Sequence, residues 1–235
     1  GKPGTWSYFE YDFSNTVFFY RVGFSNSYFG VSSNFSGAKF TDFANFSGAK
    51  FTDFADVWSA DFSGAEFTEF VDFSGAEFTG LVDFSRAKFI KGTDFYWSAD
   101  FSRAKLVEAD FSRAEFTGLV NFSGAKFTDF ANFSRAIFTW SADFSRAIFT
   151  QDAGFYGAAF IKSVIFSKAT FQTDPIFVNI RRGKTYKARF SCKTDPENYN
   201  FEASNDSPCI IETEEQEYNG VKFRIPKGAI LFDPD

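Results

Sequence analysis

The stretch Asn121–Phe149, NFSGAKFTDFANFSRAIFTWSADFSRAIF, decides the fold. Its recurring residue is phenylalanine, and the steps between successive copies alternate between five and six residues: Phe122, Phe127, Phe133, Phe138, Phe144 and Phe149. A small residue stands two positions before each of them: Val120, Ala125, Ala131, Ala136, Ala142 and Ala147. Each unit therefore reads small-x-Phe-x-x, and every second unit carries one added residue.

A helix does not fit this period. At about 100° per residue, side chains five positions apart would point about 140° away from each other, so no single apolar stripe would form. Ser, Thr, Asp, Asn and Gly are also mediocre or poor helix formers. In an extended segment, by contrast, a residue and the one two positions before it share a face. Short extended segments separated by corners would direct every Phe to one axis, and this predicts a β-solenoid.

The units resemble the pentapeptide-repeat family, whose motif is Ala-(Asp/Asn)-(Leu/Phe)-x-x. Ala99–Arg103 (ADFSR) and Ala109–Arg113 (ADFSR) match the motif at every position. The resemblance runs from Phe13 to Phe177 and implies an all-β fold, a right-handed quadrilateral parallel β-helix with four units per coil. This chain departs from the family pattern by its added residues and by using Phe almost everywhere.

Inward positions are expected throughout residues 13–177, and nearly all of them are Phe. We expect each to stack on the Phe of the next coil, which gives four ladders of rings. The alternation of fives and sixes slips twice, near Val57 and near Phe95, where we expect the added residues to move to other corners. Both of these residues are themselves predicted to be core.

Two segments flank the repeats. Residues 1–12 form an aromatic N-terminal cap segment that contains Trp6, Tyr8, Phe9 and Tyr11. After Phe177 the period stops, and turn dipeptides alternate with half-buried strand patterns, so residues 178–235 are predicted to form a small C-terminal β domain. Its Cys192 and Cys209 are predicted to form one disulfide.

The net charge of −6 is spread over both parts of the chain, so we expect no binding to nucleic acid through phosphate contacts. The sequence has no run of 18 apolar residues and therefore no predicted membrane span. It contains no Met and begins at Gly1, which we interpret as removal of an export signal or as trimming of the chain. With the paired cysteines, this favours an extracellular or cell-surface location.

Several large side chains fall outside the core register and are candidates for an interaction surface. They comprise the aromatic residues of the N-terminal segment, the added apolar residues at the corners and the Trp of a repeated Trp-Ser-Ala-Asp-Phe motif: Trp6, Tyr8, Phe9, Tyr11, Phe43, Phe54, Phe70, Phe130, Trp58, Trp97 and Trp140. Packing at the corners is the alternative use for the Trp residues, and binding of a sugar or a partner protein is the functional one.

Nothing in the sequence indicates catalysis. There is no His, neither Cys has a neighbouring base, and no phosphate loop or zinc spacing occurs, so we expect no enzyme activity, metal or cofactor. We expect instead a non-enzymatic structural protein that associates with itself end to end or laterally into a filament or layer. The alternative is a binding module, either a DNA mimic that inhibits a nucleic-acid enzyme, as the resemblance implies, or a carbohydrate binder that uses the exposed Trp residues.

Overall fold

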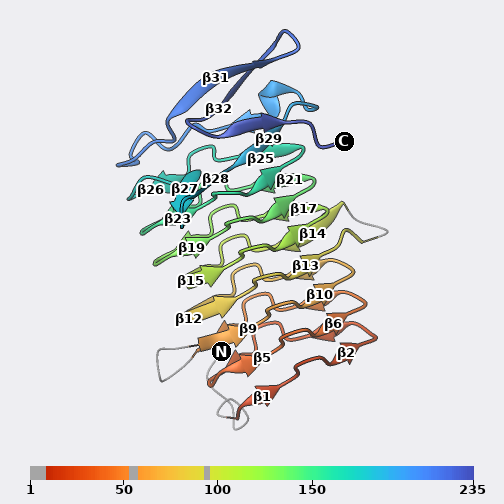
Figure 1. Cartoon of the computed structure of the whole chain (residues 1–235). Coiled ribbons are helices and arrows are strands. Elements are labelled where there is room, and N and C mark those ends of the chain that lie inside the picture. The colour runs from red at the N-terminus through yellow and green to blue at the C-terminus, as the bar shows by residue number, and fades with distance from the viewer. Residues whose placement is uncertain (1–8, 53–57, 93–95) are drawn as a thin grey trace.

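The computed structural model describes residues 9–52, 58–92 and 96–235. In this part of the chain, short parallel strands stack coil upon coil (Figure 1). The stack has four walls, numbered in the order in which the chain visits them, and their first rings are Phe13, Phe18, Phe24 and Phe29. The first and fourth walls share one sheet because two longer strands, β12 and β15, run along both.

The first and fourth walls contain β1 (Tyr11–Asp12), β4 (Tyr28–Phe29), β5 (Ser33–Asn34), β8 (Lys50–Phe51), β9 (Trp58–Asp61), β12 (Glu77–Asp83), β15 (Lys105–Asp110), β18 (Lys126–Phe127), β19 (Ala131–Asn132), β22 (Ile148–Phe149), β23 (Ala153–Gly154) and β26 (Thr170–Phe171). The second wall contains β2 (Val17–Phe18), β6 (Lys39–Phe40), β10 (Glu66–Phe67), β13 (Lys88–Phe89), β16 (Glu115–Phe116), β20 (Ile137–Phe138), β24 (Ala159–Phe160), β29 (Arg189–Ser191) and β33 (Ile230–Phe232). The third wall contains β3 (Val22–Gly23), β7 (Ala44–Asn45), β11 (Val71–Asp72), β14 (Trp97–Asp100), β17 (Leu119–Asn121), β21 (Ser141–Asp143), β25 (Ser163–Ile165) and β30 (Tyr199–Asn200).

The repeat motif builds the corners as well as the walls. In Asp83–Ala87 (DFSRA), the Asp83 carboxylate accepts a hydrogen bond from the backbone N–H of Ser85 at 2.6 Å. The N–H of Ala87 then donates to the carbonyl of Phe84 at 3.1 Å, with Arg86 at φ 60° between them. A positive φ at the third position is typical of a type II turn, which explains why Gly occupies the equivalent position in several other coils.

Each inward Phe stacks on its counterpart in the next coil, and this produces the four expected ladders. Along the first wall, the ring centroids of Phe111 and Phe133 lie 5.1 Å apart, with planes inclined by 2°. The described core positions of the quoted stretch are fully buried: Phe122, Phe127, Phe133, Phe138, Phe144 and Phe149. Leu106 replaces Phe in the fourth ladder, between Phe78 and Phe127.

The two slips in the alternation do not move the walls. Phe35 stacks directly on Phe62 at 4.7 Å, and Phe73 stacks on Phe101 at 5.0 Å. The ladders are therefore continuous without Val57 and Phe95. Both residues were predicted to be core, and both lie outside the described residues. The rings on either side of each slip keep their register, so the expected shift of the added residues to other corners in the coils that follow is wrong.

The stack continues past Phe177. Strand β29 extends the second wall and β30 extends the third, and Phe190 and Phe201 are buried members of their ladders. Residues 178–235 thus form β structure, but they share walls and core with the repeats. This segment also contains a short 3-10 helix, η2 (Pro196–Asn198).

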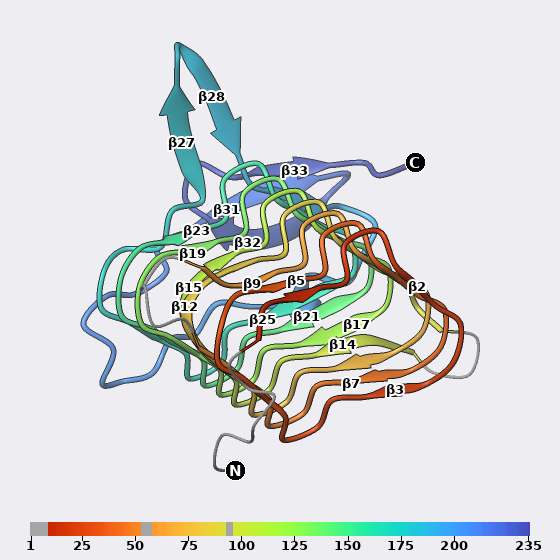
Figure 2. The same ribbon diagram turned by 90° about the horizontal axis from the view of Figure 1, so that it is seen from below.

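Two antiparallel hairpins interrupt this last part of the chain. One, β27 (Val178–Arg181) and β28 (Lys184–Lys187), projects sideways from the stack (Figure 2). The other, β31 (Thr213–Tyr218) and β32 (Val221–Pro226), covers the C-terminal end (Figure 1). Its Phe223 and Ile225 are fully buried, so this hairpin is a lid on the core.

At the N-terminal end, the described part of the chain provides no such lid. Strands β1, β2, β3 and β4 each pair on one side only, with β5, β6, β7 and β8. The rings of Phe13, Phe18 and Phe24 are half-buried, unlike those of later coils. Trp6 and Tyr8 of the predicted cap segment lie outside the described residues.

In the described part of the chain, no helix is long and apolar enough to cross a membrane.

Candidate functional site

Carboxylates follow the first wall in a line formed by Asp61, Asp83 and Asp110. Burial raises the pKa of Asp83, and the neighbouring Asp110 and Asp61 raise it further. On the third wall, burial likewise raises the pKa of Asp100, with Asp72 adding to the effect. These five acids each accept a backbone hydrogen bond from the Ser two residues later, so they serve the corner turns. We find no group of three metal-ligating side chains in the described ranges.

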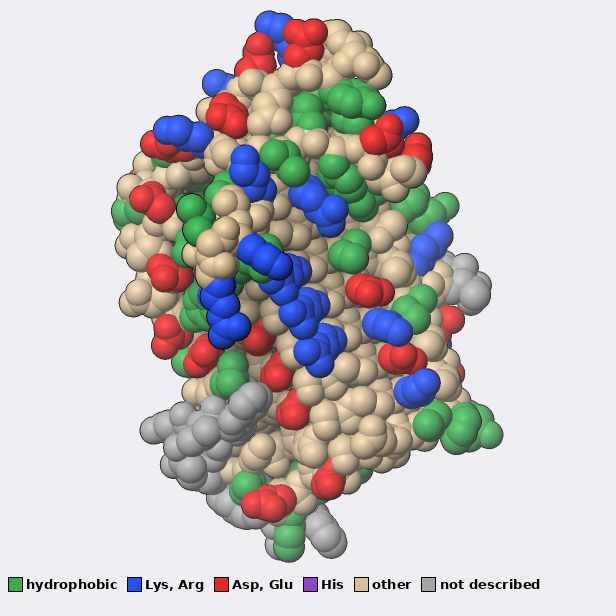
Figure 3. Space-filling model, in the orientation of Figure 1, with side chains coloured by type: hydrophobic (Ala, Val, Ile, Leu, Met, Phe, Trp, Pro, Cys, Tyr) green, Lys and Arg blue, Asp and Glu red, His purple; other side chains and the backbone are tan. Residues whose placement is uncertain are grey.

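Charged side chains of both signs alternate on the second and fourth walls. On the second, Glu66 pairs with Lys39 at 3.2 Å and Lys88 at 3.3 Å. On the fourth, Glu77 pairs with Lys50 at 2.8 Å and Lys105 at 2.7 Å. The face shown in Figure 3 also has a line of basic side chains beside acidic ones. This mixture is not the single-sign field that would imitate a DNA backbone.

One corner, between the second and third walls, gathers exposed aromatic rings and basic side chains. We call the group formed by Lys91, Tyr96, Trp140 and Lys162 the aromatic–lysine corner. The rings of Tyr96 and Trp140 lie 6.1 Å apart, and the Lys91 ammonium sits over both, at 4.7 Å and 5.8 Å. The Lys162 ammonium lies 5.9 Å from the Trp140 ring centre.

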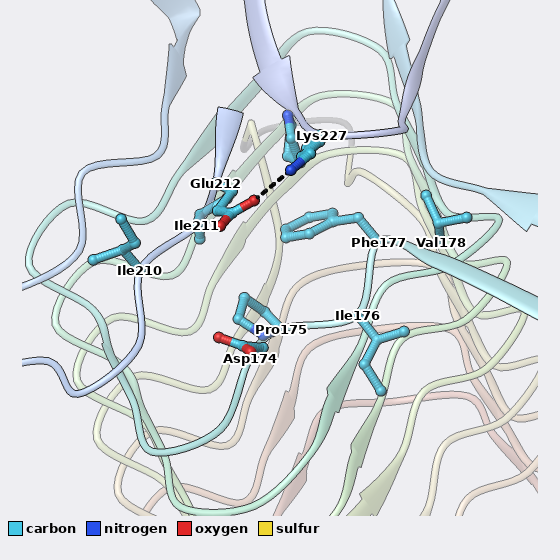
Figure 4. A pocket seen from close by; sticks show the side chains of 10 residues that line it. Asp174, Pro175, Ile176, Phe177, Val178, Ile210, Ile211, Glu212 and Lys227 are labelled. Carbon is cyan, nitrogen blue, oxygen red and sulfur yellow. Dashed lines mark hydrogen bonds and ion pairs between the residues drawn. The ribbon is translucent and has the colours of Figure 1, made fainter. Parts of the chain in front are cut away.

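A cleft of 390 Å³ lies at the seam between the stack and its lid (Figure 4). Pro175, Ile176 and Phe177 line one side, where the first wall ends. Ile211 and Glu212 line the other, and Glu212 pairs with Lys227 at 3.0 Å. The lining is mostly apolar and contains no nucleophile paired with a base, so it offers no catalytic arrangement.

The predicted disulfide between Cys192 and Cys209 is wrong, because both cysteines are free. Cys192 follows β29 on the second wall, where its N–H donates to the carbonyl of Phe232. Cys209 lies by the fourth wall, bridged to Phe171 of β26. Different walls hold the two thiols. Partial burial raises the pKa of the Cys209 thiol and Asp174 raises it further, which disfavours the reactive thiolate.

The other predicted interaction residues lie on different parts of the stack and do not form one surface. Phe43 and Phe70 stack on each other at 5.7 Å on a corner, where both are half-buried, as is Phe130 on the opposite side of the stack. Trp97 is exposed, as is Trp140. Phe9 is exposed and Tyr11 stacks beside Phe13. Phe54 and the Trp58 side chain lie outside what the structure describes.

Sequence reasoning missed Tyr96 and the two lysines beside Trp140. Lys91 and Tyr96 flank the second slip in the repeat, and this irregularity was the available signal. It also missed Phe19 and Tyr20, which are 71% and 83% exposed on the first coil. An adjacent aromatic pair outside the core register marked that position.

Comparisons with known proteins agree with the geometry. No curated protein matches the sequence. Among solved structures, one match is HetL, a pentapeptide repeat protein involved in heterocyst differentiation regulation from the cyanobacterium Nostoc sp.. It shares 16% sequence identity over 87% of this chain and 93% of its own, with a TM-score of 0.25. The family model for pentapeptide repeats matches residues 35–88, 58–96, 90–137 and 133–181. With more than half of its length matched, the chain belongs to the pentapeptide-repeat family.

Proposed function

We propose that this protein is a non-enzymatic scaffold that pairs with a second copy of itself through its N-terminal coil. The observation that carries the proposal is the difference between the two ends of the stack. The C-terminal end is closed by the hairpin β31–β32, whereas β2 presents an edge without a partner among the described strands. Unpaired strand edges are sites where another chain adds strands.

Apolar side chains accompany this edge. Val17 is exposed on β2, and Phe19 and Tyr20 follow directly at the corner. Figure 3 shows hydrophobic side chains standing out from this end of the stack. The ring of Phe18 is half-buried for lack of a further coil. Covering these groups removes apolar area from water and stabilises a complex by about 25 cal/mol for each Å² buried.

A second copy of the chain is the occupant that fits best. Two first coils meeting across a twofold axis place β2 beside its own copy in antiparallel register, and the same apolar residues then face each other. Such an interface closes, because the described part of each copy offers one open end and the hairpin β31–β32 covers the other. The expected product is a dimer of two rods joined at their N-terminal coils, rather than the filament that the sequence suggested.

The test compares the mass of the intact chain with that of the double variant Phe19→Ser, Tyr20→Ser by light scattering over a range of concentrations. Both residues are exposed, so the fold should survive, and we expect the intact chain to be a dimer at high micromolar concentration and the variant a monomer. Ile180→Ser is the matched control, because Ile180 is similarly exposed on the sideways hairpin. A monomeric intact chain, or a variant that dimerises like the parent, overturns the proposal.

A further inference from the structure

We propose that the aromatic–lysine corner is a binding site for a carboxylated polysaccharide, such as a polymer of uronic acids. It lies midway along the stack, away from the N-terminal coil, so it is independent of the self-association proposed above. The inference rests on the exposure of the two rings, on the placement of the two ammonium groups, and on the hydrogen bonds that the backbone of Lys91 and Tyr96 makes.

The rings are available for contact. Tyr96 is 64% exposed and Trp140 is 38% exposed, while Trp97 and Ile137 beside them are exposed as well. A sugar ring has one face made largely of C–H bonds, and this face packs on an aromatic ring while the hydroxyl groups stay in water. Two neighbouring rings inclined by 31° offer a broad platform for consecutive sugar units.

Among the residues that the structure describes, neither ammonium group has an acidic partner. The structure describes no carboxylate within ion-pair distance of Lys91 or Lys162, although Glu69 approaches the backbone at Gly92. By contrast, Lys39, Lys50, Lys88 and Lys105 on the walls all pair with Glu66 or Glu77. Contacts with exposed rings stabilise a lysine only weakly, so both ammonium groups remain able to bind an incoming anion.

The platform is held in place by its backbone. The carbonyl of Tyr96 accepts a hydrogen bond from the N–H of Leu119 at 2.7 Å, and the N–H of Lys91 donates to the Thr117 hydroxyl at 2.8 Å. A side chain at Gly118 would approach the Tyr96 carbonyl to 2.7 Å, so glycine is required for this close packing. A surface that is already ordered loses little conformational entropy on binding.

Carboxylate is favoured over phosphate as the anion. The site places two ammonium groups beside the faces of two aromatic rings. A uronic acid polymer matches this arrangement, because each of its sugar rings has an apolar face and carries one carboxylate. The open platform also suits a chain that passes across it rather than a small enclosed molecule.

The experiment titrates the intact protein with polygalacturonate and follows binding by calorimetry and by Trp fluorescence. We expect saturable binding that weakens with salt, at least tenfold weaker for Trp140→Ala and for the double variant Lys91→Gln, Lys162→Gln. The double variant Lys126→Gln, Lys184→Gln is the matched control, because it removes two exposed lysines elsewhere. It should bind like the parent.

Titrations with three other polymers identify the class of ligand. Dextran, which is neutral, should not bind, and poly-glutamate and single-stranded DNA should bind at least tenfold more weakly than polygalacturonate. No binding of polygalacturonate to the intact chain overturns the proposal. Equal loss of affinity in the control variant, or equal affinity for poly-glutamate or DNA, also overturns it, since binding would then follow charge alone.

Discussion

The two ends of the stack are built from the same coil and finish differently. At the C-terminal end, Phe223 and Ile225 of the hairpin β31–β32 are fully buried against the core. At the N-terminal end, the first rings of three of the four ladders, Phe13, Phe18 and Phe24, keep part of their surface exposed. The repeat specifies only how one coil sits on the next, and so it contains no stopping signal. A segment that breaks the repeat must close the stack, and this chain has a visible one at its C-terminal end.

The largest expected effect comes from opening the closed end. Ile225→Asp places a carboxylate where Ile225 is fully buried, which costs several kcal/mol without a partner. We expect the hairpin to detach while the repeats stay folded, and the last coil to expose its strand edges. Each copy would then have two open ends, so light scattering should show species larger than dimers.

Val221→Asp is the matched control, because Val221 is exposed on the same hairpin. It should leave the mass unchanged. Hydrogen exchange of the repeats distinguishes a detached lid from general unfolding. If Ile225→Asp keeps both the parent mass and the parent exchange rates in the hairpin, the hairpin is not what closes this end.

A smaller effect separates the two ends within one ladder. Phe190 is fully buried on Phe160 at 5.0 Å, near the lid, whereas Phe18 begins the same ladder half-buried. Phe190→Ala should cost about 3–5 kcal/mol in the free energy of unfolding because it leaves a cavity. Phe18→Ala should cost roughly 1–2 kcal/mol, since its ring is still partly in water. Urea denaturation of dilute protein measures both, and equal costs would mean that the N-terminal coil is covered as well as the C-terminal one.

The walls of this molecule were predictable because every coil repeats the same sequence motif. The five- and six-residue steps between Phe122 and Phe149 place the rings on one axis, and the Ser after every second Phe fits the turn. The slips near Val57 and Phe95 were misread as shifted corners. Sequence spacing cannot show that the stacked rings keep their register across both slips.

The C-terminal segment and the candidate site were harder to predict for a different reason. Phe190 and Phe201 continue two ladders, but the hairpin β27–β28 and the η2 turn lengthen the steps beyond any period. The aromatic–lysine corner joins Lys91, Trp140 and Lys162, which come together only because coils stack. The free cysteines also remove one reason for expecting an oxidising environment, so the extracellular location stays a prediction.

The smallest expected effect compares one repeat position at the open end and in the middle of the stack. Asp12 and Asp83 both precede a Phe of the first wall, and both accept a hydrogen bond from the Ser two residues on, at 2.9 Å and 2.6 Å. At Asp12, which is exposed, the hydrogen bonds from Ser14 lower the pKa of the carboxyl. At Asp83, burial and the neighbouring Asp110 and Asp61 raise it. Asn replaces Asp at this position in other coils, as at Asn132, where it accepts the same bond at 3.0 Å.

The substitution to Asn should therefore have opposite signs at the two positions. A raised pKa means that the charged Asp83 weakens the folded state at neutral pH, and this weakening disappears as the pH falls through the folded pKa toward the unfolded value of about 3.9. Asp83→Asn should thus stabilise the protein at neutral pH by roughly 0.5 kcal/mol, or about 1–2 °C in Tm, and the gain should vanish in acid. A lowered pKa means that the charged Asp12 stabilises the folded state. This stabilisation is present when the pH is above the unfolded pKa and is lost when the pH falls below the folded pKa, so Asp12→Asn should lower Tm slightly at neutral pH.

Thermal melts of both variants at neutral pH and near pH ~3.5 measure the difference. The same sign at both positions would show that the open end and the middle of the stack are equally buried, against the asymmetry on which the proposed dimer rests.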